Sequence, residues 1–330
     1  MLPKRIWLWL LCLIVIVAFV WIFTAPIERY FQFREFELWN AGYERIEVQS
    51  PFGAFHCYIR GSSSNRTPLI LVHGLGACAE YWTPFMKSLP EDRPVVSMEL
   101  LGFGRSIDPD VQPQDYTMSL YLRQLTYLQE RLHWPRPVLV GVSLGGWIAV
   151  EHALHYPRRT SGLCLIAPGG LDSQIPVEEL TELRKAFDFS TPEEYRKLIN
   201  ERILTTPRWI PEFVAHAAVD RASRGGHHAI LRNLRPDDWV GDRITELNIP
   251  IALIWGKRDR VFSFQSALRI QRKLSRARLF PIENSGHSYL MENREETIGV
   301  LREALDWLLK EIDEKKATSG TDDLTGSKSP

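Results

Sequence analysis

Residues 137–154 read Pro-Val-Leu-Val-Gly-Val-Ser-Leu-Gly-Gly-Trp-Ile-Ala-Val-Glu-His-Ala-Leu. The first four form an apolar run typical of a buried strand, and the last eight have the apolar spacing of a helix. Between them the run from Gly141 to Gly146 predicts a sharp turn that exposes the hydroxyl of Ser143 at its tip. The N-terminus of the following helix favours negative charge, which suits a nucleophile whose attack creates an oxyanion.

Short apolar runs alternate with helical patterns on both sides of this stretch. Such alternation predicts βαβ units and a mostly parallel sheet flanked by helices. A hairpin with a turn at 50–53 precedes the first parallel strand. We assign residues 43–168 and 249–312 to this core. The predicted strands cover residues 43–49, 54–60, 69–72, 94–98, 137–140, 163–167, 251–255 and 278–282.

The alternation pauses between residues 169 and 248, which contain several helical patterns and no convincing strand. One helix is predicted to start at Thr191-Pro192-Glu193-Glu194, where a capping residue precedes a proline and two acids. We interpret 169–248 as a helical cap over the carboxyl edge of the sheet, where open α/β folds bind ligands. The polar segment 313–330 is rich in Gly, Ser, Thr and Lys, and we expect it to be disordered.

A serine hydroxyl is a weak nucleophile, and the glycine-serine motif around Ser143 also occurs by chance, so its interpretation depends on partners. It needs a base that takes its proton and an acid that orients that base. Asp259 directly follows one predicted buried strand, and His287 follows the next. Both loops lie on the sheet edge that carries the serine turn. We therefore predict that Ser143, Asp259 and His287 form a catalytic triad.

An oxyanion hole requires two preorganised backbone N–H groups. Leu144, directly after the serine, is expected to supply one. The loop after residues 69–72 is expected to supply the other, with Leu75 as the best candidate. We interpret His73 in the same loop as a brace and not as the base, because the position of His287 in the chain fits that role better.

The composition restricts the classes of function. The 330-residue chain has a hydrophobic fraction of 45% and a formal net charge of zero, which describes a globular protein without a nucleic-acid surface. Its four cysteines are too few for a disulfide framework, and no Cys/His cluster has zinc-ligand spacing. We interpret the pairs His152/His155 and His227/His228 as structural or solvent-facing. No metal, cofactor or nucleic-acid partner is expected.

The N-terminus contains an uncharged run from Ile6 to Ile27, preceded by Lys4 and Arg5. Its apolar heart, as a helix, reaches about 27 Å, close to the thickness of a bilayer's hydrocarbon core. The run is long for a cleaved signal peptide, so we expect residues 1–28 to be a single-span membrane anchor. Lys4 and Arg5 favour a catalytic domain on the non-cytoplasmic side, periplasmic or luminal, although Arg29 and Arg34 weaken this bias.

The juxtamembrane segment 29–42 is amphipathic. Its aromatic residues recur every three positions and alternate with charged residues. Such a helix can lie in the lipid interface, or it can pack against the body of the protein. The sequence leaves both arrangements open. The aromatic residues are Tyr30, Phe33, Phe36 and Trp39.

Five motifs together resemble the α/β-hydrolase superfamily along residues 45–312, in which the triad follows the order Ser, Asp, His. The N-terminal span, the helical insert and the last two motifs also resemble membrane-anchored monoacylglycerol lipases and related bacterial lipases. One departure is Glu99-Leu100-Leu101-Gly102, where relatives usually have an aspartate and a proline before the glycine. The motifs are HGLG at 73–76, LGFGRS at 101–106, GVSLGG at 141–146, IWGKRDRV at 254–261 and ENSGHSYLMENRE at 283–295.

The resemblance implies an α/β-hydrolase fold and a serine hydrolase that cleaves acyl esters of lipids, with the predicted triad in the catalytic role. Trp82 and Trp147, together with cap residues such as Trp209, are candidates for the wall of an acyl pocket. Two alternatives on the same fold are a C–C bond hydrolase and an acyltransferase. An alternative of another class is a non-catalytic ligand receptor that keeps the fold.

Overall fold

The computed structural model describes residue 7 and residues 26–61 and 64–325. The anchor predicted at 1–28 therefore lies almost entirely outside the described residues. Within the described part of the chain, no helix is both long and apolar enough to cross a membrane.

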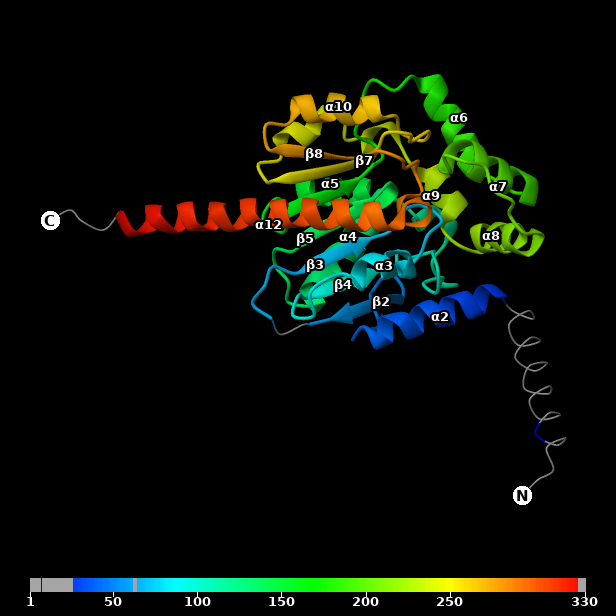
Figure 1. Cartoon of the computed structure of the whole chain (residues 1–330), viewed down its shortest axis with the longest axis horizontal. Helices are drawn as coiled ribbons and strands as arrows, with labels where there is room; N and C mark the ends of the chain where they lie inside the picture. The colour runs from blue at the N-terminus through cyan, green and yellow to red at the C-terminus, as the bar shows by residue number, and fades with distance from the viewer. Residues whose placement is uncertain (1–6, 8–25, 62–63, 326–330) are drawn as a thin grey trace.

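A mixed eight-stranded sheet forms the centre of the molecule (Figure 1). Its order is β1-β2-β4-β3-β5-β6-β7-β8. The pairs β1–β2 and β2–β4 are antiparallel, and all other pairs are parallel. The strands are β1 (Glu44–Val48), β2 (Phe55–Arg60), β3 (Leu69–Val72), β4 (Val95–Met98), β5 (Val138–Val142), β6 (Gly162–Ile166), β7 (Ile251–Gly256) and β8 (Ala277–Ile282).

Helices cover both faces of the sheet, as the alternation predicts. The helices α3 (Thr83–Met86) and α12 (Arg294–Thr325) contact each other on one face, and α4 (Met118–Arg131) and α5 (Leu144–His155) contact each other on the opposite face (Figure 1). A further helix, α10 (Phe264–Lys273), packs on β7 and β8. Every residue of β3, β5, β6 and β7 is buried, which explains their continuously apolar sequences. The fold prediction is confirmed for the sheet and its flanking helices.

Between β6 and β7, a stretch that is described throughout, the chain forms helices and no strand. At the start of α7 the hydroxyl of Thr191 accepts from the N–H of Glu194, whose own carboxylate accepts in return. These helices lie at one end of the sheet (Figure 1), and we call residues 169–248 the cap. The cap elements are α6 (Val177–Phe187), α7 (Pro192–Leu198), the π-helical turn η3 (Ile199–Ile203), α8 (Glu212–Arg224), α9 (His227–Asn233) and the 3₁₀ turns η4 (Pro236–Asp238) and η5 (Gly241–Glu246).

The C-terminal segment differs from the expectation of disorder. α12 continues to Thr325 and extends beyond the body of the protein (Figure 1). Ile312 is buried, and Lys315 donates to the carbonyl of Asn248 at 2.7 Å, so tertiary contacts continue past the expected end of the core. Lys310 and Glu314 also form an i,i+4 pair at 3.7 Å. The expectation weighed the composition and missed this helical charge pairing.

The helix α2 (Pro26–Asn40) packs against the body of the protein, which is one of the two arrangements that the sequence leaves open. Two of its acidic residues contact the body: Glu35 pairs with Arg45 at 3.0 Å, and Glu37 pairs with Lys87 at 2.5 Å. Its aromatic side chains are directed to the outside. The exposed fractions are 50% for Tyr30, 58% for Phe33 and Phe36, and 67% for Trp39. Most surface helices have the reverse polarity.

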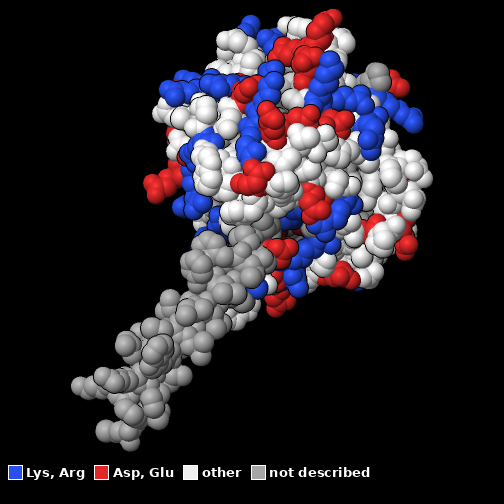
Figure 2. All heavy atoms as spheres, turned by 90° about the vertical axis from the view of Figure 1, so that its right-hand side faces the viewer, with Lys and Arg blue, Asp and Glu red and all other residues white. Residues whose placement is uncertain are grey.

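Acidic and basic side chains are interspersed over the face that carries the cap (Figure 2). No extended area of a single charge is visible among the described residues on this face. This mixture agrees with the zero net charge of the chain and offers no basic stripe to a phosphate backbone.

The turn between β5 and α5 depends on glycines that allow backbones to touch. A Cβ atom on Gly141 would collide with the carbonyl of Gly145. A Cβ atom on Gly145 would in turn collide with the carbonyls of Val72 and His73 at the end of β3. The obstacles are backbone atoms, which cannot rotate away as a side chain can.

Replacing Gly141 with Ala is expected to reduce the free energy of unfolding by about 1–3 kcal/mol, because the added methyl group forces the backbones apart. Gly299→Ala is the matched control. No atom lies within 4 Å of a Cβ there, so this exposed helical site should gain up to about 1 kcal/mol. Urea unfolding measures both values. Equal effects of the two substitutions would contradict the packing argument.

Candidate active site

Ser143 lies at the corner between β5 and α5 with a backbone φ of 54° and ψ of −117°. A non-glycine residue in this region carries about 1–3 kcal/mol of strain. Three hydrogen bonds hold the corner: Ser143 N–H donates to Ile166 at 2.9 Å, and its carbonyl accepts from Trp147 at 3.0 Å and Gly169 at 3.1 Å. The serine is half-buried and borders a cavity. The structure thus places it at the tip of a sharp turn, as the sequence predicts.

The loop after β3 runs beside this corner. A Cβ atom on Gly74 would lie 3.3 Å from the Cβ of Ser143. Leu75 and Leu144 border the same cavity as Ser143. Leu144 is the first residue of α5, where a backbone N–H has no partner within its own helix. The two residues whose amides are proposed for the oxyanion therefore border the same cavity as the serine.

His73 braces this loop and does not face the cavity. Its ring is fully buried, and its Nδ1 lies 2.8 Å from the carbonyl of Gly74. Its Nε2 accepts from the N–H of Leu100 at 3.0 Å. Burial lowers the pKa of His73 to about 4, so the ring stays neutral at neutral pH. Both ring nitrogens are used to connect two loops.

Asp259 and His287 form a buried hydrogen-bonded pair. His287 Nδ1 donates to Asp259 Oδ2 at 2.8 Å. The other carboxylate oxygen accepts from the backbone N–H groups of Val261 at 2.8 Å and Phe262 at 3.0 Å. A fourth donor, the hydroxyl of Tyr289, reaches Oδ2 at 2.6 Å. All four donors converge on the carboxylate and keep it in one orientation.

The cap touches the loop that carries His287. The N–H of His287 donates to the carbonyl of Ile203, at the end of the π-helical turn, at 3.0 Å. Glu292 bridges the same elements, since it accepts from the N–H of Thr205 at 2.6 Å and from Gly286 at 3.2 Å. The position of the imidazole therefore depends on the position of the cap.

A cavity of about 640 Å³ lies between the cap and the serine turn. Its wall is largely apolar. Phe262 connects the wall to the base, because its ring packs edge-on against that of His287 at 5.7 Å. The residues that line the cavity and carry its apolar character include Trp147, Leu180, Leu183, Phe187, Ile230, Leu231, Trp239, Val261 and Phe262.

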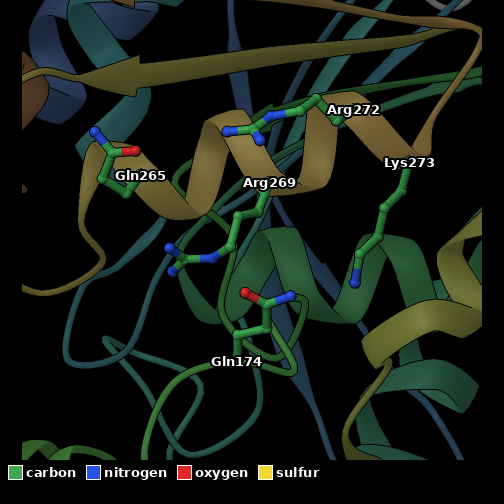
Figure 3. Close-up of a pocket in the computed structure, with 5 residues that line it drawn as sticks. All are labelled: Gln174, Gln265, Arg269, Arg272 and Lys273. Carbon is green, nitrogen blue, oxygen red and sulfur yellow. The ribbon is translucent and has the colours of Figure 1, made fainter.

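The acidic side chain in the cavity wall, Asp172, forms an ion pair with Arg269. Arg269 of α10 binds both of its carboxylate oxygens, with Nε at 3.1 and 3.2 Å. Arg269 also lines a separate polar hollow of about 390 Å³, where it extends from α10 toward the loop of Gln174 (Figure 3). The Asp172–Arg269 pair thus separates this hollow from the apolar cavity.

Two of the tryptophans predicted for the acyl pocket lie elsewhere. Trp82 is fully buried beside Tyr81 and Phe85 and does not border the cavity. Trp209 is 85% exposed on the cap. Trp147 does border the cavity, and its indole N–H donates to the carbonyl of Asp238 at 2.8 Å. Sequence hydrophobicity alone does not distinguish a core tryptophan from a cavity tryptophan, which explains both errors.

A family model described as "Alpha/beta hydrolase family" matches residues 69–300. The chain belongs to the alpha/beta hydrolase family. The match includes the serine turn, Asp259 and His287, and it covers the whole cap.

Several relatives of this α/β hydrolase act on lipids or esters by name. Human monoacylglycerol lipase ABHD6 is 26% identical over 266 residues, which cover 73% of this chain and 76% of the relative. A crystal structure of a membrane phospholipase A is 26% identical with a TM-score of 0.74, covering 93% of this chain and 99% of the other. A lipase structure from Acinetobacter baumannii, at 22% identity and a TM-score of 0.73, covers 86% and 96% and supports the fold.

The family's sequence variety also includes peptidases. A proline iminopeptidase from Lactobacillus helveticus is 26% identical over 296 residues, covering 80% of this chain and 98% of that enzyme. The fold and the family therefore establish a hydrolase with lipase-like and esterase-like relatives. The bond that this α/β hydrolase cleaves must be argued from its own residues.

Behind the active site of this α/β hydrolase, Cys78, Glu80 and Glu99 place potential metal-ligand atoms within 4.8 Å of one another. Arg105 pairs with Glu80. Glu99, at the departure from the usual motif, accepts from the N–H of Arg105 at 2.8 Å and from Ser106 Oγ at 2.9 Å. Burial and the nearby Glu80 raise the pKa of Glu99 to about 7. Arg105 thus places a positive charge beside this cluster.

The raised pKa of Glu99 makes stability depend on pH. Its folded pKa of about 7 exceeds the ordinary value of 4.5, so its stabilising contribution is complete below pH 4.5 and is lost as the pH rises through 7. A Glu99→Gln variant keeps an acceptor for Arg105 and Ser106 but cannot ionise. Its free energy of unfolding relative to wild type should therefore be more favourable at pH 8 than at pH 5. Urea unfolding at both values tests this, and an identical difference at both would contradict it.

Proposed function

We propose that this α/β hydrolase is a serine hydrolase that cleaves carboxylic esters of lipids, with Ser143, Asp259 and His287 as its triad. The observation that carries the proposal is the buried Asp259–His287 hydrogen bond at 2.8 Å, together with a strained serine beside an apolar cavity. A nucleophile, a base and an orienting acid are the three roles that acyl transfer requires.

The mechanism assigns each group one task. Ser143 Oγ attacks the ester carbonyl while Nε2 of His287 takes its proton. Asp259 fixes Nδ1 as the protonated nitrogen and stabilises the imidazolium. The N–H groups of Leu75 and Leu144 bind the oxyanion. His287 then gives its proton to the leaving alcohol and activates water, which releases the acid from Ser143.

The apolar cavity supports an acyl chain as the group that it binds. Its one acidic wall residue, among the described lining, is paired with Arg269, so an uncharged chain meets no free carboxylate. The names of the human monoacylglycerol lipase and of the membrane phospholipase A support the same class of substrate. Monoacylglycerol-like esters fit this description.

We also propose that residues 1–28 anchor the enzyme in a membrane, with the catalytic domain on the non-cytoplasmic side. The apolar run from Ile6 to Ile27 supports the anchor. The exposed aromatic face of α2, which follows directly, supports contact with the lipid interface. Because the charges of α2 are held by the body, its aromatic face is free to enter the headgroup region.

Ser143→Ala is expected to reduce kcat/KM for acyl esters by at least about a thousandfold with little change in stability, because the variant lacks the nucleophile. Wild type should prefer long-chain esters of glycerol over acetate and butyrate esters. Hydrolysis of one ester series by both proteins measures both effects.

Ser173→Ala is the matched control, since Ser173 also borders the cavity but lies at its exposed rim. It should retain nearly wild-type turnover. Near-full activity of Ser143→Ala would refute the triad. A preference for the shortest esters would refute the lipid substrate and leave the chemistry intact.

Membrane anchoring predicts that the full chain stays in the membrane pellet after a wash with alkaline carbonate. Arginines in place of Ile14 and Ile16 should release it, because each charge costs about 2.5–3.5 kcal/mol at the centre of a span. Glu311→Arg with Asp313→Arg is the control and should not release it. Wild-type protein in the carbonate wash would contradict the anchor, as would a mature protein whose N-terminus lies beyond residue 28. A reporter fused to the C-terminus tests on which side of the membrane the catalytic domain lies.

A further inference from the structure

Asp259 Oδ2 carries two hydrogen bonds from side chains. His287 Nδ1 donates to it at 2.8 Å, and the hydroxyl of Tyr289 donates to it at 2.6 Å. The first bond belongs to the proposed triad. The second comes from α11 (Tyr289–Glu292), the short helix that begins two residues after the imidazole. The same carboxylate oxygen therefore accepts hydrogen bonds from both His287 and Tyr289.

The surroundings of Tyr289 fix the direction in which its hydroxyl donates. The side chain is fully buried. The backbone N–H of Gly256 donates to the hydroxyl oxygen at 3.4 Å, so the tyrosine's own proton is directed to Asp259. The residue's carbonyl accepts from Thr297 Oγ1 of α12 at 3.0 Å, which ties α11 to the core. Burial and the nearby carboxylate raise the pKa of Tyr289 well above its ordinary value, so it remains a donor throughout the working range of pH.

We propose that Tyr289 is a positioning residue that sets the basicity of His287 through Asp259. The proposal rests on the triad of the proposed function. By donating to Oδ2, the hydroxyl helps to hold the carboxylate in place and withdraws part of the charge that would otherwise stabilise the imidazolium. Tyr289 touches neither Ser143 nor the cavity wall in the described residues.

The sign of the effect follows from this competition. A carboxylate with one donor fewer attracts the imidazolium proton more strongly, which raises the pKa of the base. A base with a raised pKa is protonated, and so inactive, up to a higher pH. Loss of the Tyr289 hydroxyl therefore moves the acidic limb of the activity profile toward higher pH. A purely structural role for the tyrosine would lower stability without moving this limb.

Other titratable groups close to the pair do not take over this role. Tyr81 packs behind Tyr289 and binds the backbone of Leu290. Glu292 binds Thr205 and Gly286, and Arg260 donates to the carbonyl of Thr205 at 3.4 Å. Among the described residues, none of these side chains forms a recorded hydrogen bond to Asp259 or His287.

The test is the pH dependence of the rate at which a fluorophosphonate modifies the full-length protein, which requires no knowledge of the natural substrate. Tyr289→Phe should shift the acidic limb upward by about 0.5–1 pH unit, because the lost hydrogen bond acts on the imidazole only in part, through Asp259. With an ester substrate the loss should fall on kcat and leave KM nearly unchanged. Tyr81→Phe is the matched control, because it removes a neighbouring hydroxyl that does not reach Asp259, and its limb should stay in place.

A second variant keeps the test decisive if Tyr289→Phe does not fold. Fluorotyrosine introduced at position 289 retains the ring and donates more strongly, so it should move the limb to lower pH. An unshifted limb in a folded variant would overturn the role of Tyr289, as would equal shifts for the two Tyr→Phe variants. Failure of the wild type to react at all would instead overturn the proposed function, so the two failures are distinguishable.

Discussion

The contact between the backbones of β3, β5 and α5 is the constraint on which the site depends. At Gly141 and Gly145 a side chain would collide with carbonyl groups, so only glycine permits this approach. The approach forces Ser143 into a backbone conformation with positive φ. It also brings the loop of Gly74 beside the serine, so that the proposed nucleophile and the two residues proposed to supply oxyanion donors border one cavity. Packing of the buried sheet stabilises the strained backbone of Ser143.

The cap contacts both His287, the proposed base, and the loop that follows β3 beside the serine turn. His287 is held from below by Asp259 and from the cap side by the carbonyl of Ile203. His227 of the cap lies close to Gly76 in the loop after β3, since its Nδ1 would be 3.3 Å from a Cβ atom on Gly76. A displacement of the cap would therefore disturb both the base and the loop of the oxyanion donors. The cavity proposed to bind the substrate is lined by residues of the cap and of the serine turn.

The sequence predicts the elements whose physical signal is local. Continuous apolar runs marked the buried strands, and the glycine-serine turn marked the corner. The order of Asp259 and His287 on successive strand ends brought them together, and the structure joins them by a hydrogen bond. What the sequence could not show depends on packing across the fold. Trp82 and Trp147 have the same side chain, yet only Trp147 borders the cavity.

Tyr289 is a residue whose role the sequence does not reveal. It lies two residues after His287 and reads as an ordinary aromatic residue, because nothing local reveals that its hydroxyl reaches a carboxylate thirty positions away. The composition of the segment after residue 312 likewise concealed the continuation of α12 to Thr325. Apolar residues that repeat within about a dozen positions predict a helix or a strand. The hydrogen-bond partner of a single polar atom depends instead on tertiary structure.

The most direct measurement is identification of the residue that a fluorophosphonate modifies covalently, by mass spectrometry of the digested full-length protein. A triad that activates one serine predicts a single stoichiometric adduct on the peptide that contains Ser143. The neighbouring cavity serine, Ser173, should remain unmodified. An adduct on any other residue, or no adduct on a folded protein at pH 8, would contradict the assignment of Ser143 as the nucleophile.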